Sequence, residues 1–151
     1  MDANRLADLE AIKQLEARYF RLMDTKQWAL WADVFCEDCS MRSGPADSPA
    51  VRGRDAIVRY ARGFIERVIT VHHGHMPEIE FTGPDSATGV WAMYDQLRGP
   101  GFVLDGWGHY HEEYRRCADG RWRIASTRLT RLRVESPDPA IVASLWPESA
   151  R

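Results

Sequence analysis

The hydrophobic pattern of the chain changes its period at Ile69, and this change constrains the fold more than any other feature. Before Ile69, apolar residues recur every three or four positions, which is the spacing of amphipathic helices. After it, apolar and polar residues alternate, which is typical of strands with one buried face. Helices followed by consecutive strands predict an α+β fold, in which helices cover one face of an antiparallel sheet.

Helices are predicted before this change, over residues 2–24, 28–35 and 54–68. The first has an apolar stripe that we expect to face the core, with the charged residues, Glu16 among them, mostly on the other side. The stripe consists of Leu6, Leu9, Ile12, Leu15, Tyr19, Leu22 and Met23. Cys36–Cys39 should end the second helix, and the glycine and prolines of segment 43–49 are typical of a loop.

Strands are predicted after the change, over residues 78–81, 87–98, 106–117 and 122–134. Turn-forming sequences separate them at 83–85, 99–101 and 118–120. In the tail, residues 139–145 can form a short helix whose apolar side chains need a surface to cover. That surface is a face of the sheet or a neighbouring subunit, and we expect a homodimer or homotrimer.

Length and charge narrow the classes of function. The 151 residues are enough for one domain, expected to span 1–151 with a core at about 5–134 and a tail at 135–151. The formal net charge of −2 gives no electrostatic reason to bind nucleic acid or an anionic membrane, so we expect neither partner. We also expect no secretion signal and no membrane span, because no apolar run is long enough. Three cysteines, an odd number, favour a reducing, cytoplasmic location.

The clearest chemical feature is a cluster formed by His72, His73 and His75, three of the five histidines in the chain. Histidine titrates closest to neutrality, so the cluster suggests proton transfer or metal binding, although a surface turn without chemistry also accounts for it. No H-E-x-x-H or comparable motif supports a metal. The C-x-x-C spacing of Cys36 and Cys39 lacks the second pair that a structural zinc site needs. We therefore expect no metal site.

Two aspartates and a tyrosine occupy unusual positions. Asp24 lies at the predicted end of the first helix, where a carboxylate is unfavourable beside the negative end of the helix dipole. Bonded to one imidazole nitrogen of the cluster, it would raise the basicity of the other nitrogen and so prepare a general base. Asp95 follows the apolar run Val90–Tyr94, so it needs a partner or a proton if it is buried, or else faces water at a sheet edge. Tyr19 lies on the apolar stripe, where its hydroxyl needs a partner.

The second half of the chain carries further histidines and arginines. His109 and His111 alternate with Tyr110, and Tyr110 is the better choice for the inward face. The arginines of the last strand fit a solvated edge better than a nucleic-acid surface, although one of them could contact a ligand anion or carbonyl. These arginines are Arg121, Arg123, Arg128, Arg131 and Arg133. No dinucleotide, P-loop or nucleophile-elbow motif is present, so we expect no nucleotide cofactor and no serine nucleophile.

The order of elements and several local sequences resemble the SnoaL-like branch of the nuclear transport factor 2 superfamily. The matching segments are Ile12–Tyr19, Met23–Asp24, Val51–Ile57, Val71–Gly74 and Asp119–Ile124. The resemblance covers about residues 5–134. It implies a cone-shaped α+β barrel, in which three N-terminal helices pack on a strongly curved mixed or antiparallel sheet and leave a pocket between them. This fold hosts dehydratases, isomerases, a dehydrochlorinase and non-enzymes, so the resemblance specifies the fold more closely than the reaction.

The resemblance also implies roles for individual residues. Within this branch, the catalytic histidine falls on His72 and its aspartate partner on Asp24. The bile acid 7α-dehydratases add a tyrosine and an aspartate, which fall on Tyr19 and Asp95. We therefore expect these four residues to be catalytic in a cofactor-independent dehydratase that acts on a small hydrophobic hydroxy-carbonyl compound.

Other members of the branch are less similar at their characteristic positions. The scytalone dehydratases carry a tyrosine where this chain has Met23, and a second one where it has Ser40–Arg42. The dehydrochlorinase carries an arginine where Thr127 falls, next to Arg128. A ketosteroid-type isomerase and a non-catalytic ligand-binding module are the alternatives to a dehydratase. We expect the ligand to contact Trp28, Trp31, Phe64, Trp91, Met93, Tyr110 and Arg128.

Overall fold

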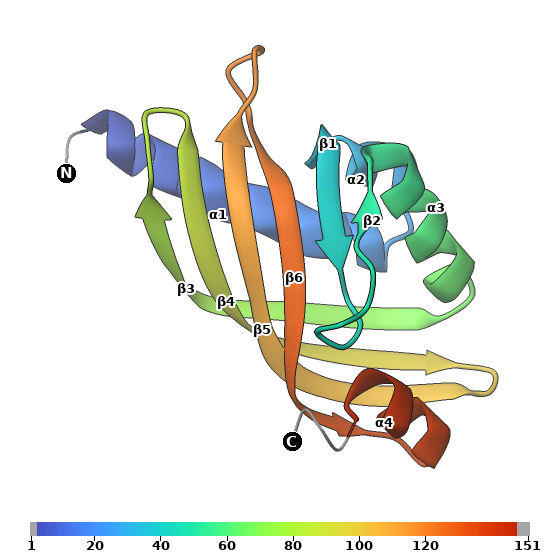
Figure 1. Ribbon diagram of the computed structural model, residues 1–151. Helices are drawn as coiled ribbons and strands as arrows, with labels where there is room; N and C mark the ends of the chain where they lie inside the picture. Colours follow the sequence, from blue (N-terminus) through green and yellow to red (C-terminus); the bar gives the residue numbers. More distant parts are fainter. Residues whose placement is uncertain (1–2, 148–151) are drawn as a thin grey trace.

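A strongly bent sheet forms the centre of the computed structural model, which describes residues 3–147 (Figure 1). Within these residues, the strands are β1 (Phe35–Arg42), β2 (Val51–Arg52), β3 (Ile69–Phe81), β4 (Ser86–Gly99), β5 (Phe102–Arg116) and β6 (Trp122–Glu135). The helices are α1 (Ala3–Asp24), α2 (Trp28–Ala32), α3 (Arg54–Ile65) and α4 (Pro139–Leu145). None of these helices is both long and apolar enough to cross a membrane.

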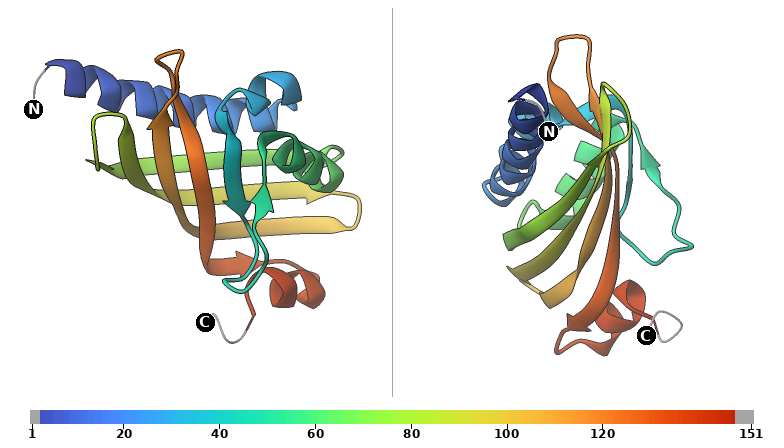
Figure 2. Two further views of the ribbon diagram at one scale, coloured as in Figure 1. Left: turned by 45° about the horizontal axis from the view of Figure 1, so that its top comes forward. Right: turned by 90° about the vertical axis from the view of Figure 1, so that its left-hand side faces the viewer.

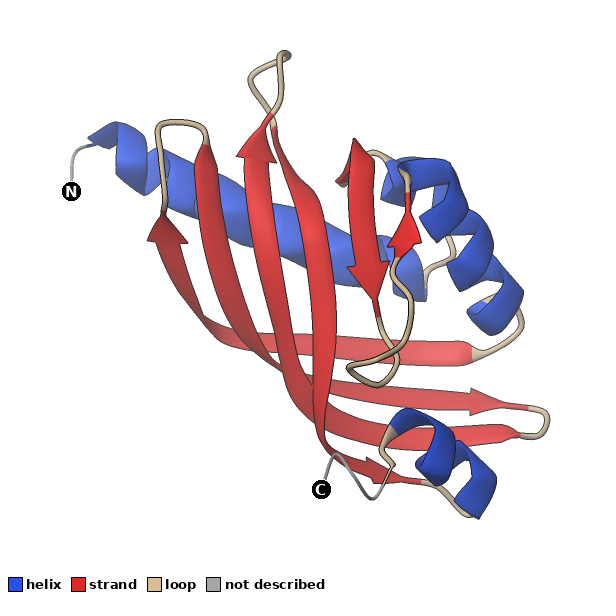
Figure 3. Ribbon diagram, viewed as in Figure 1, coloured by secondary structure: helices blue, strands red, loops and turns tan. Residues whose placement is uncertain are grey.

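The strands follow the order β2-β1-β6-β5-β4-β3 across the sheet. β1 and β6 run parallel, whereas the other neighbours are antiparallel. Within residues 3–147, β2 and β3 form the two edges, so the sheet is open and does not close into a barrel. α1 runs along one side of the sheet, and α2 and α3 lie next to β1 and β2 (Figure 2, Figure 3).

Two of the strand pairings contain irregularities next to residues of the inner strands. β3 shifts its register between His75 and Glu78, and the β5–β6 pairing shifts beside Gly108. A Cβ atom on Gly108 would lie 2.0 Å from the carbonyl oxygen of Thr130, so only glycine fits at this point. Bulges bend the strand that carries them and increase its twist. The result is a concave inner face on which helices can pack.

The core lies between this concave face and α1. Buried and more exposed residues alternate along β4, and the buried set is Ala87, Gly89, Trp91, Met93, Asp95 and Leu97. α1 contributes its apolar stripe, including Ile12, Leu15 and Tyr19. Because neighbouring strand residues point to opposite faces, the alternation determines which side chains enter the interior.

The predicted α+β class and most of its elements are confirmed. α1 spans Ala3–Asp24, and the predicted first residue, Asp2, lies outside the described residues. α4 spans the predicted residues, and β4, β5 and β6 agree with the prediction to within four residues at each end. α4 begins where it was predicted because the Asp138 side chain accepts a hydrogen bond from the Ala140 N–H at 2.9 Å, which caps the helix.

Three predictions about secondary structure were wrong. The second helix ends at Ala32, and Cys36–Cys39 belong to β1 rather than ending the helix. Phe35 fits the helical spacing that starts at Trp28, but it is the first buried residue of a strand whose parallel partner, β6, comes much later in the chain. The third helix ends at Ile65, within three residues of its predicted end, but β3 starts at Ile69 rather than at residue 78, so the histidine cluster lies inside a strand rather than before one.

Candidate functional site

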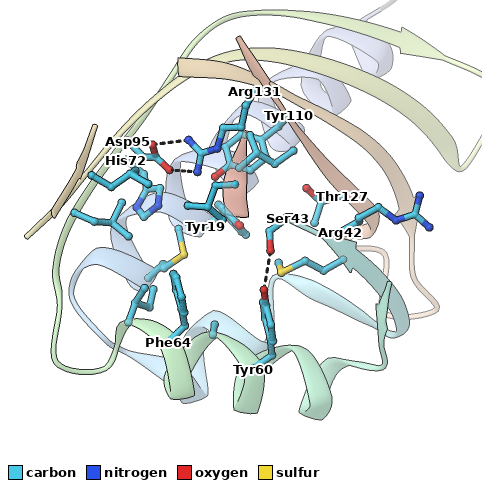
Figure 4. A pocket seen from close by; sticks show the side chains of 18 of the residues that line it. Tyr19, Arg42, Ser43, Tyr60, Phe64, His72, Asp95, Tyr110, Thr127 and Arg131 are labelled. Atoms are coloured by element: carbon cyan, nitrogen blue, oxygen red, sulfur yellow. Dashed lines mark hydrogen bonds and ion pairs between the residues drawn. The ribbon is translucent and has the colours of Figure 1, made fainter. Parts of the chain in front are cut away.

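A cavity of about 150 Å³ opens between α1, α3 and the concave face of the sheet (Figure 4). Most of its lining is apolar, with Leu97, Leu104 and Leu129 from the strands among the contributors. Its polar lining residues include Tyr19, His72, Asp95, Tyr110, Thr127 and Arg131. Tyr60 and Phe64 of α3 also line the cavity, yet each is almost half exposed, so they mark its mouth. The Tyr60 and Ser43 hydroxyls are hydrogen-bonded at 3.1 Å there.

Asp24 and His72 form a close pair beside this cavity. Nδ1 of His72 lies 2.7 Å from Oδ1 of Asp24, and the His72 backbone N–H donates to Oδ2 at 2.9 Å. The Thr70 hydroxyl also donates to Oδ1 of Asp24, at 2.9 Å. A carboxylate only accepts hydrogen bonds, so Nδ1 of a neutral His72 carries the proton and Nε2 has the free lone pair. A histidine held in this tautomer can act as a general base through Nε2.

The end of α1 places Asp24 for this contact. The helix stops because Lys26 adopts a left-handed φ of 57°, and the Gln27 N–H returns to the Leu22 carbonyl at 2.9 Å. A carboxylate at this end of a helix is disfavoured by the dipole. The donors from Thr70 and His72 compensate Asp24, which explains how the chain tolerates an acid here.

Asp95 and Arg131 form a buried, bidentate ion pair. The two guanidinium nitrogens donate to the two carboxylate oxygens at 2.7 and 2.8 Å. The side chains are only 4% and 10% exposed, respectively. His72 and Asp95 are directly opposite each other on β3 and β4, which puts their side chains next to each other on the inner face. The pair therefore places a carboxyl group and a guanidinium group, each oriented by the other, at the wall of the cavity that carries His72.

Gly106 makes room for this ion pair. It lies opposite Asp95 on β5 and faces inward. A Cβ atom at this position would lie 2.0 Å from Nη1 of Arg131 and 2.2 Å from Oδ1 of Asp95. Any residue larger than glycine would displace the pair. The glycine in β5 therefore leaves the space that Asp95 of β4 and Arg131 of β6 occupy.

Two tyrosines complete the polar part of the cavity. The rings of Tyr19 and Tyr110 meet edge to face, with centroids 6.0 Å apart. Burial raises the pKa of each phenol well above its ordinary value, and at Tyr110 the negative charge of Asp95 adds to this effect. Both phenols therefore keep their protons near neutral pH and can donate hydrogen bonds to a ligand oxygen.

Two carboxyl groups, those of Glu16 and Glu112, are buried in the core. The Tyr114 hydroxyl donates to Glu112 at 2.7 Å and accepts from Nε1 of Trp91 at 2.7 Å. Burial and the neighbouring Glu112 raise the pKa of Glu16 well above its ordinary value, so Glu16 is expected to be neutral. The prediction that Glu16 faces solvent was wrong, although its spacing from Ile12 and Tyr19 places it on the apolar stripe.

Some of the expected ligand contacts lie at the cavity and others do not. Trp31, Phe64 and Tyr110 line it. Trp28, Trp91, Met93 and Arg128 are absent from its lining in the described part of the chain. Trp28 packs edge to face on Trp31, with ring centroids 5.7 Å apart. The Nε1–H group of Trp91 donates a hydrogen bond to the Tyr114 hydroxyl.

The arginine of β6 that reaches the cavity is Arg131, not Arg128. Thr127, Leu129 and Arg131 alternate toward the interior, whereas Arg128 is exposed on the opposite face. Because every second residue of a strand points to the same face, the position of Arg131 two residues after Leu129 could have predicted that it points inward. His73, His75, His109 and His111 likewise alternate away from the buried face of their strands, so His72 is the histidine of the cluster that lines the cavity.

Comparisons with known proteins agree with this architecture. The profile of the SnoaL-like domain family matches residues 4–128. A scytalone-dehydratase-like protein from Novosphingobium aromaticivorans superposes with a TM-score of 0.81 at 21% identity, covering 91% of this chain and 93% of that one. A hexachlorocyclohexane dehydrochlorinase from Novosphingobium barchaimii gives 0.76 at 19% identity, covering 89% and 93%. A Mycobacterium tuberculosis protein of unknown function, solved with an aspartate-to-asparagine substitution, gives 0.73 at 30% identity, covering 89% and 82%.

Proposed function

Since the chain belongs to the SnoaL-like domain family, a branch of the nuclear transport factor 2-like superfamily, we propose that it is a cofactor-independent dehydratase of a small hydrophobic hydroxy-carbonyl compound. One observation carries the proposal. A histidine oriented by a carboxylate lies beside a buried carboxylate–arginine pair in one largely apolar cavity. The names of two similar structures, a dehydratase and a dehydrochlorinase, both denote removal of a proton and a leaving group from one molecule.

His72 begins the proposed reaction. Its Nε2 atom removes a proton from the carbon next to the substrate carbonyl, and the Asp24 carboxylate stabilises the imidazolium that results. General-base assistance of this kind typically contributes about 10²–10⁴-fold to the rate. The cavity is largely apolar, and exclusion of water strengthens these electrostatic contacts.

The tyrosines stabilise the charge that then develops. Removal of the proton moves negative charge onto the carbonyl oxygen, and the O–H groups of Tyr19 and Tyr110 are neutral donors that can bind it. Donors that are fixed before the reaction need no reorganisation when the charge appears. A phenol that keeps its proton can donate this hydrogen bond, whereas a phenolate cannot.

Asp95 and Arg131 position the leaving hydroxyl. Both oxygens of the Asp95 carboxyl accept hydrogen bonds from Arg131, so we assign Asp95 the role of accepting a hydrogen bond from the substrate hydroxyl. The proton for the departing hydroxyl comes back from the His72 imidazolium. The C–H and C–O bonds break, a C=C bond forms, one water leaves and His72 returns to its neutral state.

The size of the cavity limits the substrate. About 150 Å³ corresponds to a space that holds one benzene-sized ring. A larger substrate would have to extend through the mouth, where it would contact Tyr60 and Phe64. The substrate is therefore proposed to present one six-membered ring, or a group of that size, to His72.

The test is an assay of water loss from a matched β-hydroxy ketone. We expect 3-hydroxycyclohexanone to be converted to cyclohexenone, followed by the ultraviolet absorbance of the enone and by mass. His72→Asn should abolish this conversion, whereas His73→Asn, a neighbouring histidine on the outer face, should retain it. A product isomeric with its substrate in a wider ketone screen would favour the isomerase. Tight binding with no turnover of any hydroxy ketone would favour a binding module.

A further inference from the structure

Two cysteine thiols from distant parts of the chain lie next to each other outside the cavity. Sγ of Cys36 in β1 lies 3.8 Å from Sγ of Cys117, which follows β5 and is 81 positions away. Cys36 is buried at 2% exposure, and Cys117 is partly exposed. The third cysteine, Cys39, is fully buried. A pair with one accessible and one buried thiol is arranged for sequential oxidation.

The surrounding structure holds the two cysteines together without a covalent bond. The buried Arg123 donates to Asp33, three residues before Cys36, and to Asp119, two residues after Cys117. The turn that contains Cys117 is closed by its own N–H, which donates to the Arg121 carbonyl at 2.8 Å. A buried arginine with several charge-assisted hydrogen bonds is a rigid connection. The contact between the thiols is thus set by the fold.

We propose that Cys36 and Cys117 are joined by a disulfide when the protein meets a hydroperoxide. The sulfur atoms need to approach from 3.8 Å to about 2.05 Å, the length of an S–S bond. A shift of under about 2 Å is within reach of side-chain torsions and small backbone adjustments. The contact with Cys117 is made by Cys36, and burial keeps Cys39 from being the thiol that a peroxide reaches first.

The chemistry balances with hydrogen peroxide as the oxidant. The Cys117 sulfur attacks one peroxide oxygen and becomes a sulfenic acid, while the other oxygen leaves with the proton of the Cys117 thiol as water. Cys36 sulfur then displaces the sulfenic hydroxyl, which leaves with the Cys36 proton as a second water. Two thiols are oxidised to one disulfide, and one peroxide is reduced to two waters.

The charges around the thiols support this order of events. Cys117 is the thiol that a peroxide can reach first, because it is partly exposed and lies beside Arg123 at the surface turn. Burial raises the pKa of Cys36 despite the nearby Arg115, so Cys36 remains a thiol until it attacks. Neither residue lines the cavity in the described part of the chain. The bridge would therefore stabilise the fold by closing a long loop without altering the proposed site.

The test is peroxide treatment of the full chain, followed by thiol titration and mass spectrometry. We expect two of the three thiols to be lost, the monomer mass to fall by two hydrogen atoms, and dithiothreitol to restore both. Trypsin should release a peptide of residues 27–42 joined to residues 117–121. Because the first peptide contains both Cys36 and Cys39, the assignment uses Cys39→Ser, which should still form the bridge. The oxidised protein should also unfold at a higher temperature.

Variants in which one cysteine is replaced by serine test which two thiols form the disulfide. Cys117→Ser and Cys36→Ser should each form no bridge within the chain, and circular dichroism checks that they fold. A Cys36–Cys39 link, a disulfide between two copies of the chain, or sulfinic acid at Cys117 without any link would each overturn the proposal. Retention of all three thiols under peroxide would overturn it as well.

Discussion

Replacement of Arg131 by methionine is predicted to expose how strongly the buried ion pair depends on both of its partners. The variant keeps most of the side-chain volume but leaves the carboxylate of Asp95 buried, with both arginine hydrogen bonds lost. With charge centres about 4 Å apart and an effective dielectric constant of about 20, the lost attraction is about 4 kcal/mol. Breaking one side of a buried pair typically costs about 3–5 kcal/mol. We therefore expect the free energy of unfolding to fall by about 3–4 kcal/mol near pH 7.5.

A double variant identifies the cause of this loss, because it removes both members of the pair. The double variant Arg131→Met, Asp95→Asn removes the charge, and we expect its stability to lie within about 1–2 kcal/mol of the original chain.

Urea unfolding followed by tryptophan fluorescence measures these differences. The structure predicts a large loss in the single variant and recovery of most of it in the double variant. If Arg131→Met unfolded within about 1 kcal/mol of the original chain, Asp95 would not be a buried group that depends on Arg131. A double variant as unstable as the single one would point to lost packing instead.

Three more changes test other parts of the structure. Gly106→Ala should destabilise the protein by at least about 2 kcal/mol in urea unfolding, because its Cβ atom would collide with the side chains of Arg131 and Asp95; an unchanged midpoint would contradict this packing. Burial raises the pKa of Glu16 in the folded state. The stabilisation that comes from a protonated Glu16 is therefore fully present below about pH 4.5 and is lost as the pH rises through the folded-state pKa. The free energy of unfolding falls by up to about 1.4 kcal/mol per pH unit in this range. Glu16→Gln should therefore stabilise the protein increasingly from pH 5 to pH 8, and a difference that does not change with pH would refute a neutral Glu16. Asp24→Asn should lower the dehydration rate about 10²-fold or more because the amide stabilises the His72 imidazolium less well; an unchanged rate constant would exclude a role for this contact.

The order of the elements could be predicted from the sequence because it depends on local patterns. The change of period at Ile69 separates the helices from the long strands, and the helix after Asp138 begins with a proline and an aspartate cap. β1 could not be recognised in the same way. Its parallel partner is β6, and the tryptophans that precede Phe35 continue a helical spacing into its first residue.

The candidate site could be predicted only in part. The position of Asp24 against the helix dipole was a local signal, and the structure places it 2.7 Å from His72. The pairing of His72 with Asp95 depends on the register of two strands. Pro77 marks the irregularity in β3 that follows it, but a proline does not by itself determine the register. Glu16 was misplaced because a charged residue on an apolar stripe is usually solvated. Here Glu16 is buried, and burial raises its pKa so that the side chain is expected to be protonated and neutral.

The most direct test of the central claim follows proton removal by itself, without a leaving group. Cyclohexanone in deuterated water exchanges the protons next to its carbonyl, and nuclear magnetic resonance records the rate. We expect the original chain and His73→Asn to accelerate this exchange, and His72→Asn to reduce it to the rate in buffer. If His72→Asn exchanged these protons as fast as the original chain, His72 would not be the base.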